Sequence, residues 1–356
     1  MGELPRPSQK PSQRPPSAPP QSTGQARSQR VPGSIPPSSM PRAAALPRGT
    51  GTILVTGACG RLGKHVVRIQ HRERRVIGVD RRPFPDKPKD VVHEQVDIRR
   101  KKLKDLFRAE PIEAVIHLGV MHDPRASQAE HHSWNVAGFQ KLLEYVAHFQ
   151  VPKLVVLSSA NVYGPQPDNA QFLTEDAPLL GGARFSEIRD LIEVDMLAQG
   201  FFWKHPSTET VILRPVHIVG AVHNAASNFM RLSTIPTLLG FDPMVQVIHE
   251  SDVVAAIGRA LVPGRRGIYN VAGAEPLPLS HIVKILGKPS IPIPYTFGKA
   301  LLKRLWAFRL TTFPAPELDH IRYVCMVDDR RAREELGYVA AMPIEETVRS
   351  VELESW

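Results

Sequence analysis

The sequence is poor in cysteine and has no long apolar run. Only two cysteines, Cys59 and Cys325, occur among 356 residues, so no disulfide framework can be drawn. No apolar run approaches the roughly 18 residues that span a bilayer, and the start of the chain lacks the continuous apolar segment of a secretory signal. We therefore expect a soluble protein of the cytoplasm.

Acidic residues are also few, 35 against 45 lysines and arginines, which gives a net charge of +10. The basic excess lies mostly in residues 1–50, where seven basic side chains face Glu3 alone, a local charge of +6 that leaves +4 for the remainder. A globular part of this size with so small a charge needs no polyanionic partner. We expect no nucleic-acid partner.

Residues 1–48 hold twelve of the 34 prolines, with Ser, Gln and Arg between them and no apolar periodicity. Such a segment cannot bury enough surface to offset its conformational entropy. We predict a disordered tail over 1–48 with local polyproline II structure. A solvated extension is the favoured interpretation, and a ligand for a proline-recognition domain or an address peptide is the alternative.

From Gly51 onward, short β-branched runs alternate with helical patterns, which is typical of βαβ units. The predicted strands are Thr52–Thr56, Arg75–Asp80, Val91–Val96, Ala114–Leu118, Lys153–Ser158 and Thr210–Leu213. The predicted helices are Leu62–Gln70, Lys101–Ala109, Ser133–Phe149 and Ser186–His205. This order predicts an α/β fold with a doubly wound, Rossmann-like parallel sheet. No linker separates further domains, so 49–350 is expected to form one.

A glycine-rich segment, TGACGRLG at Thr56–Gly63, follows the first predicted strand and opens the first helix. Its glycines let the backbone turn sharply and approach a pyrophosphate, while the helix N terminus offers N–H donors. Asp80 ends the second strand, 23 residues after Gly57, where a carboxylate can accept hydrogen bonds from an adenosine ribose. The alternative for Asp80 is a turn or cap residue. We predict a dinucleotide site here.

Residues suited to a ligand also follow the other predicted strands, and ligands of parallel sheets bind at the carboxyl ends of the strands. The predicted cofactor-binding residues are Gly57, Cys59, Gly60, Arg61, Leu62, Gly63, Asp80, Arg81, Asp97, Ile98, Leu118 and Gly119. NAD is the favoured cofactor because Asp80 suits a free 2′-hydroxyl. NADP stays open because Arg81 and Arg82 could hold a 2′-phosphate.

Several segments together resemble the extended short-chain dehydrogenase/reductases, the NAD-dependent epimerases and dehydratases typified by UDP-galactose 4-epimerase. They are TGACGRLG, Asp97-Ile98, Asn135, SSANVYG at 158–164, TEDAPL at 174–179, LRPVHIVG at 213–220 and IHESDVVAAI at 248–257. The likeness extends from about Gly51 to about Ser350. It implies a cofactor-binding sheet and a smaller substrate-covering region, drawn mainly from residues 215–350.

Enzymes of this family use an Asn, a Ser and a Tyr that is followed four residues later by a Lys. The resemblance places the first two at Asn135 and Ser159, but Phe185 stands at the tyrosine position and Arg189 at the lysine position. A phenyl ring has no exchangeable proton and a guanidinium stays protonated, so the usual acid–base step cannot run through these side chains. Arg189 could still donate hydrogen bonds to the cofactor ribose.

Three function classes therefore stay open. The first is an enzyme that transfers a hydride to or from a sugar-nucleotide-like or apolar hydroxyl or keto substrate, with Tyr163 as the substitute acid–base group. A buried tyrosine that lines the pocket is the favoured interpretation of Tyr163. The second class is a catalytically silent dinucleotide-binding sensor or scaffold. The third is an adaptor that works through the proline-rich tail.

Cysteine and histidine offer two further candidate sites. Cys59 lies near a helix N terminus, which could stabilise a thiolate and make a redox switch, but a small residue that fills space is favoured. His117, His122, His131 and His132 are close in sequence, yet their spacing matches no metal site. We expect no metal.

The segment Lys299–Leu310 is basic and amphipathic. We expect it to pack on its own domain rather than on a membrane. An apolar lining formed by Leu301, Leu305, Trp306 and Phe308 would favour a lipid-like or sterol-like substrate over a nucleotide sugar. The helix around 141–149 suggests a homodimer, by analogy with relatives that pair through helices beside the sheet.

Overall fold

The structure, a computed structural model, describes residues 51–120, 127–183, 186–308, 318–319 and 321–352. Seven strands form the central sheet of this part, in the order β11-β6-β5-β4-β1-β2-β3, and all the pairs are parallel. The strands are β1 (Thr52–Thr56), β2 (Arg75–Asp80), β3 (Val92–Gln95), β4 (Ile112–His117), β5 (Lys153–Leu157), β6 (Glu209–Pro215) and β11 (Gly267–Val271). The predicted doubly wound α/β fold is confirmed.

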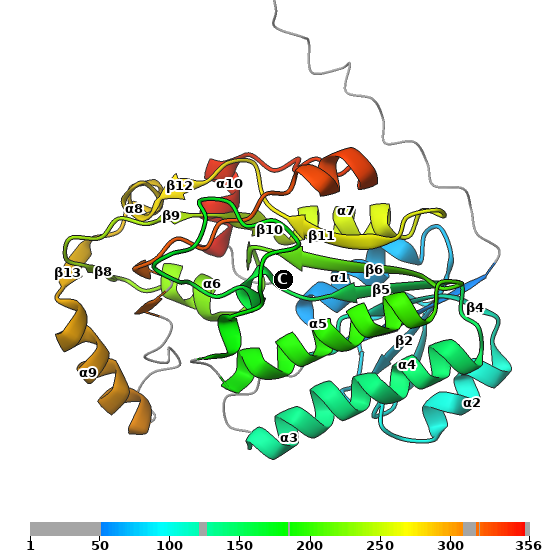
Figure 1. Ribbon diagram of the computed structural model, residues 1–356. Coiled ribbons are helices and arrows are strands. Elements are labelled where there is room, and N and C mark those ends of the chain that lie inside the picture. The colour runs from blue at the N-terminus through cyan, green and yellow to red at the C-terminus, as the bar shows by residue number, and fades with distance from the viewer. Residues whose placement is uncertain (1–50, 121–126, 184–185, 309–317, 320, 353–356) are drawn as a thin grey trace, which may run out of the picture. The chain divides into compact units, whose positions relative to one another are not determined.

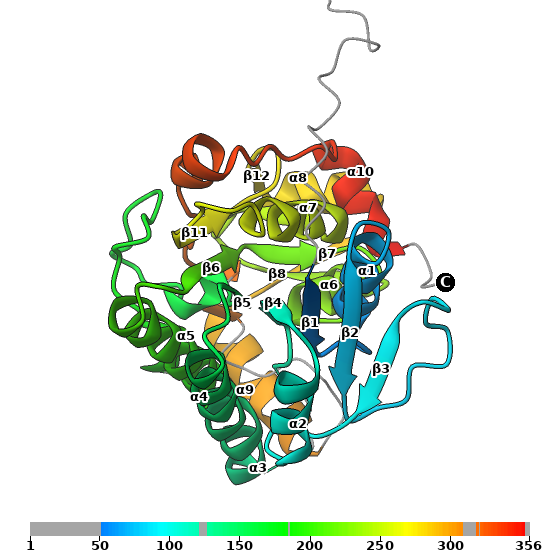
Figure 2. The ribbon, with the colours of Figure 1, turned by 90° about the vertical axis from the view of Figure 1, so that its right-hand side faces the viewer.

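Helices cover both faces of this sheet (Figure 2). The helices are α1 (Arg61–Gln70), α2 (Lys102–Ala109), α4 (Gly138–His148), α5 (Ser186–Lys204) and α7 (Glu250–Ala260). Apolar side chains of α1 and α7 join one buried cluster, and those of α2 and α4 join another. Helix α5 contributes to both, with Leu191 in the first cluster and Val194 in the second. The two clusters lie on opposite faces of the sheet, which is the arrangement that a doubly wound sheet requires.

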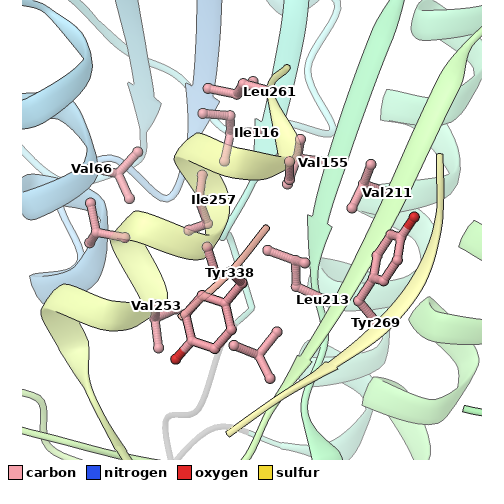
Figure 3. Packing of buried hydrophobic residues seen from close by; sticks show 14 of the residues in the cluster. Val66, Ile116, Val155, Val211, Leu213, Val253, Ile257, Leu261, Tyr269 and Tyr338 are labelled. Carbon is pink, nitrogen blue, oxygen red and sulfur yellow. The ribbon is translucent and has the colours of Figure 1, made fainter. Parts of the chain in front are cut away.

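The apolar character of the strands follows from this double cover. All five residues of β1 are buried, and successive side chains point to opposite faces: Ile53 and Val55 belong to the first cluster and Leu54 to the second. Figure 3 shows Val253 and Ile257 of α7 packed above the strands of the first cluster.

The C-terminal part adds three small sheets beyond one end of the large one (Figure 1). They pair β7 (His217–Val219) with β10 (Val247–His249), β8 (Ile235–Leu238) with β13 (Ser290–Ile293), and β9 (Met244–Val245) with β12 (Leu277–Pro278). Their helices are α6 (Ala225–Met230), α8 (Leu279–Leu286), α9 (Tyr295–Ala307) and α10 (Ile344–Arg349). A third apolar cluster, here called the C-terminal core, includes Phe229, Leu238, Ile282 and Val348.

The predicted strands and helices agree with the structure to within a few residues. One difference is that the helix predicted over Ser133–Phe149 is divided into a π-helical segment, Ser133–Ala137, and α4, with a short helix α3 (Gln128–His132) before them. Strand β11, at the edge of the sheet, helix α7 and most strands and helices of the C-terminal part were not predicted. The predicted tail, 1–48, lies outside the described residues. Among the helices that are described, none has both the length and the apolar character of a membrane span.

Candidate functional site

The glycine-rich turn after β1 lies at the point where the strand order of the sheet reverses, because β1 is paired with β2 on one side and with β4 on the other. Gly57 has a positive φ of 74°. A Cβ atom on Gly57 would lie 2.9 Å from the backbone of Leu118 and Gly119, and one on Gly63 would lie 2.1 Å from the Gly57 carbonyl oxygen. Only glycine fits at these two positions, so the turn, α1 and the end of β4 stay in close contact.

The N terminus of α1 is open toward an anion. No side chain caps it, and its first turn holds no acidic residue. The first intrahelical hydrogen bond is donated by the Lys64 N–H to the Gly60 carbonyl oxygen, at 2.8 Å. The N–H groups of Arg61, Leu62 and Gly63 are therefore not used within the helix, as at the start of any α-helix. They provide donors and positive potential at the turn.

Asp80 lies beside this turn at the end of β2 and is buried. Its Oδ2 accepts a hydrogen bond from the Cys59 N–H at 3.0 Å, and its Oδ1 accepts one from the Arg82 N–H at 2.9 Å. Burial by itself raises the pKa of Asp80, but the hydrogen bonds from Arg82 and Cys59 outweigh it and hold the pKa below its ordinary value. Asp80 is thus a carboxylate held against the glycine-rich turn.

The guanidinium of Arg82 pairs with the same carboxylate in a bidentate manner. Nε lies 3.1 Å from Oδ1 and Nη2 lies 3.1 Å from Oδ2 of Asp80. With the two backbone donors, the carboxylate already accepts four hydrogen bonds, so a ribose hydroxyl can reach it only when Arg82 turns aside. The Arg82 side chain is 57% exposed and is free to do so. The sequence suggested Arg82 only as a phosphate ligand and gave no sign of this pairing.

Cys59 is almost fully enclosed at the turn, with 8% exposure. Its Sγ donates to the Arg82 carbonyl oxygen at 3.3 Å and lies 3.5 Å from Nε2 of His93. Burial, followed by the charge of Asp80, raises the pKa of Cys59 to about 11. These surroundings support the space-filling interpretation of Cys59 over a thiolate switch.

A group of basic and aromatic side chains surrounds the ends of β2 and β3. The guanidinium groups of Arg81 and Arg99 lie 5.0 Å and 5.2 Å from the ring centre of Trp134. Arg99 also pairs with Asp97, with Nη2 2.5 Å from Oδ2. Ile98 is buried below the start of α4. The predicted residues Arg81, Asp97 and Ile98 therefore all lie near the strand ends, as the motif requires.

His117, the last residue of β4, is fully buried beside the turn. Its Nδ1 lies 2.8 Å from Oγ1 of Thr56, and its ring stacks on Phe139. Nε2 finds no hydrogen-bond partner among the described residues. Burial lowers the pKa of His117 to about 4, so this histidine is neutral at physiological pH.

Asn135 and Ser159, the predicted catalytic pair, are held by irregular backbone. Asn135 is buried within the π-helical segment, and such segments are frequent at functional sites. Ser159 is half-buried and accepts a hydrogen bond from the Asn161 N–H at 3.1 Å through its Oγ. Their roles in catalysis stay a prediction.

Tyr163 is enclosed by a buried polar network rather than open to a cleft. Its hydroxyl donates to Oδ1 of Asn270 at 2.7 Å and accepts from Nη1 of Arg214 at 2.8 Å. Arg214 in turn makes a bidentate ion pair with Asp195 of α5, and both side chains are buried. Burial raises the pKa of Tyr163 to about 12. These contacts support the buried-tyrosine interpretation of Tyr163. The Arg214–Asp195 pair was not predicted, although Arg214 lies in a marker segment.

Phe185 lies outside the described residues. Arg189 is exposed, and its Nε donates to the Gly182 carbonyl oxygen at 2.9 Å. It lines an open groove of about 410 Å³ together with Leu180, Ile192 and Met196. Its described contacts are with this groove, and none is with the glycine-rich turn or Asp80. Its predicted hydrogen bond to a cofactor ribose therefore stays a prediction that no contact supports.

A cavity of about 230 Å³ lies in the C-terminal part. Its lining is mainly apolar and includes Phe229, Leu232, Leu238, Leu301, Leu305 and Ile321. Two of the four side chains proposed as an apolar lining, Leu301 and Leu305, thus line a cavity. Phe308 is 74% exposed, and the Trp306 side chain lies outside the described part.

A parallel sheet of this strand order, with a glycine-rich turn where the order reverses, defines the Rossmann-like class of α/β proteins. Residues 53–272 match the family model described as the NAD dependent epimerase/dehydratase family. Because this stretch exceeds half of the sequence, the chain belongs to that family.

Relatives and solved structures agree with this assignment. An uncharacterized protein of Mycobacterium tuberculosis is 27% identical over 306 residues, which cover 82% of this chain and 81% of that protein. A dTDP-4-dehydro-6-deoxy-D-allose reductase of Streptomyces bikiniensis is 26% identical, with 67% and 82% covered. MoeE5 in complex with UDP-glucuronic acid and NAD is similar in structure, with a TM-score of 0.66, 22% identity and coverage of 85% and 98%. The UDP-glucose 4-epimerase of Thermotoga maritima, solved with UDP-glucose, has a TM-score of 0.65, 18% identity and coverage of 85% and 97%.

Proposed function

We propose that this protein binds NAD(H) at the glycine-rich turn and holds a small hydroxyl or keto compound, sugar-nucleotide-like or apolar, near the C-terminal part. The observation that carries the proposal is the close contact of Gly57 and Gly63 with the backbone around them, beside the carboxylate of Asp80. A Cβ atom at either glycine would collide with backbone atoms, which would lie 2.9 Å from it at Gly57 and 2.1 Å from it at Gly63. The residues present therefore fit a pyrophosphate at the start of α1 and a ribose at Asp80.

Bound NAD would supply a hydride acceptor, and NADH a hydride donor. Two observations support the substrate class. The reductase of Streptomyces bikiniensis is named for a dTDP-sugar substrate, and MoeE5 and the Thermotoga maritima epimerase were solved with UDP-sugars, whereas the mainly apolar cavity next to α9 suits an apolar group. Ser159 would donate a hydrogen bond to the substrate oxygen. Asn135 would hold the backbone of the site in place.

A second candidate, a catalytically silent dinucleotide binder, is favoured by specific residues. Phenylalanine and arginine replace the acid–base pair of the family at Phe185 and Arg189. Tyr163, the substitute considered for the acid–base group, has its hydroxyl occupied by Arg214 and Asn270, and its pKa is raised to about 12. A proton donor with so high a pKa, held away from a cleft, is poorly matched to catalysis near neutral pH.

Cofactor binding is tested by calorimetric titration of the purified chain with NADH and NADPH. We expect saturable binding of NADH, and the Asp80→Ala variant should bind about ten- to a hundredfold more weakly, since a hydrogen bond to a charged group contributes roughly 1.5–3 kcal/mol. Asp86→Ala is the matched control, because Asp86 is an exposed aspartate that pairs with Lys64. Absence of binding of either dinucleotide at millimolar concentration would overturn the proposal.

An enzyme and a silent dinucleotide binder would both bind the cofactor, so an assay of hydride transfer is needed to distinguish them. The protein, in molar excess over NAD, is mixed with UDP-glucose or with an apolar secondary alcohol, and reduced nicotinamide is followed by absorbance. Formation of NADH identifies an enzyme. Bound NAD that stays oxidised with both substrates identifies a silent binder. A Ser159→Ala variant that abolishes NADH formation while it still binds NADH would assign Ser159 to the substrate.

A further inference from the structure

A histidine and two carboxylates come together between α3 and α5, away from the glycine-rich turn. His132 ends α3, and Asp190 and Glu193 are one helical turn apart in α5. Nδ1 of His132 lies 3.3 Å from Oδ1 of Asp190 and 3.7 Å from Oε2 of Glu193, and the three ligand atoms all lie within 4.8 Å of one another. It is the one such group of three among the described residues.

We propose that His132, Asp190 and Glu193 bind a divalent transition-metal ion, with Zn²⁺ as the first choice. One imidazole nitrogen and two carboxylate oxygens are ligands that Zn²⁺ accepts, at about 2.0–2.2 Å. In a tetrahedral site with bonds of that length, neighbouring ligand atoms lie roughly 3.3–3.5 Å apart. The distance to Asp190, 3.3 Å, lies within this range, whereas the distance to Glu193, 3.7 Å, exceeds it, so binding of the ion requires the half-exposed Glu193 carboxylate to move closer to His132.

The charge and burial of the group favour a cation. The Asp190 side chain is only 7% exposed, whereas His132 and Glu193 are 52% and 47% exposed. Two carboxylates beside one imidazole leave the group with a net negative charge in either protonation state of the imidazole, and a buried carboxylate needs a nearby positive partner. Arg189, the basic residue next to Asp190, is directed to the Gly182 carbonyl oxygen instead. A divalent ion would balance both carboxylates, while one water could complete its coordination from the exposed side.

Sequence spacing does not reveal such a site, because its ligands come from segments almost sixty residues apart. Among the histidines near 117–132, His117 is buried at the end of β4 and His122 lies outside the described residues. A metal at His132 would join α3 to α5. It would also fix the start of the π-helical segment that carries Asn135, and this role does not depend on dinucleotide binding.

The test uses the full chain without an affinity tag, stripped with a chelator and titrated with Zn²⁺ by calorimetry. We expect one equivalent to bind, and the His132→Ala and Glu193→Gln variants should each lose affinity by more than about tenfold, since even the loss of an outer partner of a metal ligand costs 10–100-fold. His71→Ala is the matched control, because His71 also pairs with a carboxylate, Asp90, at 3.1 Å but has no third ligand in the described part.

Thermal unfolding gives the second readout. Zn²⁺ should raise the midpoint of the wild-type chain and of His71→Ala, but not that of Glu193→Gln, whose half-exposed side chain can be changed without harm to folding. The proposal is wrong if Zn²⁺ does not bind, which would leave only the contacts of His132 with the two carboxylates. It is also wrong if the variants bind Zn²⁺ as the wild type does, or if binding is lost in Cys59→Ala instead.

Discussion

At the scale of single residues, the pairing of Asp80 with Arg82 decides how the adenosine end of a dinucleotide would be recognised. A free aspartate at this position accepts hydrogen bonds from both ribose hydroxyls and repels a 2′-phosphate. Here the exposed guanidinium of Arg82 neutralises that carboxylate and also lies close to Gly60 of the turn. Arg82 is thus able to serve a 2′-phosphate when it leaves Asp80, so the chain has residues for both dinucleotides.

The Arg82→Gln substitution should therefore discriminate between the cofactors. NADPH should bind about ten- to a hundredfold more weakly, because one charged hydrogen bond to the 2′-phosphate is lost. NADH should change by less than about threefold, because the freed Asp80 still accepts from the ribose. Calorimetric titration of wild type and variant with each dinucleotide measures both effects. Equal losses for NADH and NADPH would show that Arg82 does not contact the 2′ position.

His117 predicts a dependence of stability on pH. Its folded-state pKa of about 4 lies below the ordinary value of 6.5, so the unfolded chain takes up the proton first. The free energy of unfolding should then fall as pH drops from 6.5 toward 4, by up to about 1.4 kcal/mol per pH unit. His117→Asn, which keeps a polar group near Thr56, should be less stable at pH 7, but its free energy of unfolding should depend less on pH. Urea unfolding at pH 7, 6 and 5 measures this dependence. An unchanged slope would assign the titration to other groups, such as His217, whose pKa is also lowered to about 4.

At the scale of elements, the packing of α1 on the glycine-rich turn shows why the motif needs its third glycine. Gly63→Ala would place a methyl group 2.1 Å from the Gly57 carbonyl oxygen, so α1 must move away from the turn. Although alanine favours a helix by about 1 kcal/mol, the clash should dominate and lower the free energy of unfolding by about 1–3 kcal/mol. Affinity for NADH should fall with it.

Gly200→Ala is the matched control for that prediction. Gly200 is exposed in α5, and a Cβ atom there meets nothing within 4 Å. The same substitution should then raise the free energy of unfolding by about 0.5–1 kcal/mol. Denaturant unfolding of both variants measures the two changes in the free energy of unfolding. If Gly63→Ala stabilised the protein, the contact between Gly63 and the Gly57 carbonyl oxygen would be less close than it is in the structure.

The sequence predicted the elements that local pattern controls and missed those that depend on distant partners. The β-branched runs gave β1 and β2 with their observed ends, because both are buried on two faces. The glycine spacing placed Asp80 at the turn. The Arg214–Asp195 pair and the group around His132 each join residues far apart in the chain, and no local pattern encodes them. Strand β11 was missed because it depends on an edge position beside β6.

At the scale of the whole molecule, the buried apolar residues of the described part form three clusters that we expect to differ in local stability. Two of them lie on the faces of the seven-stranded sheet, where each packs against helices and against strands that, apart from the edge strands β11 and β3, are paired on both sides. The C-terminal core rests on two-stranded sheets, which have little stability of their own. It also lies next to exposed apolar side chains such as Leu239 and Ile291. Resistance to local opening should therefore differ between the two regions.

Hydrogen exchange measures that difference directly. Amides of β8 and α8, in the C-terminal core, should exchange before those of β4 and β5, because opening there exposes less apolar surface and breaks fewer paired strands. Saturating NADH should slow exchange at the turn after β1 much more than in α8, since the proposed contacts lie at α1 and Asp80. Mass spectrometry of proteolytic fragments, with and without NADH, resolves these segments. Equal exchange in β4 and α8 would mean that the sheet and the C-terminal core open together as one cooperative unit.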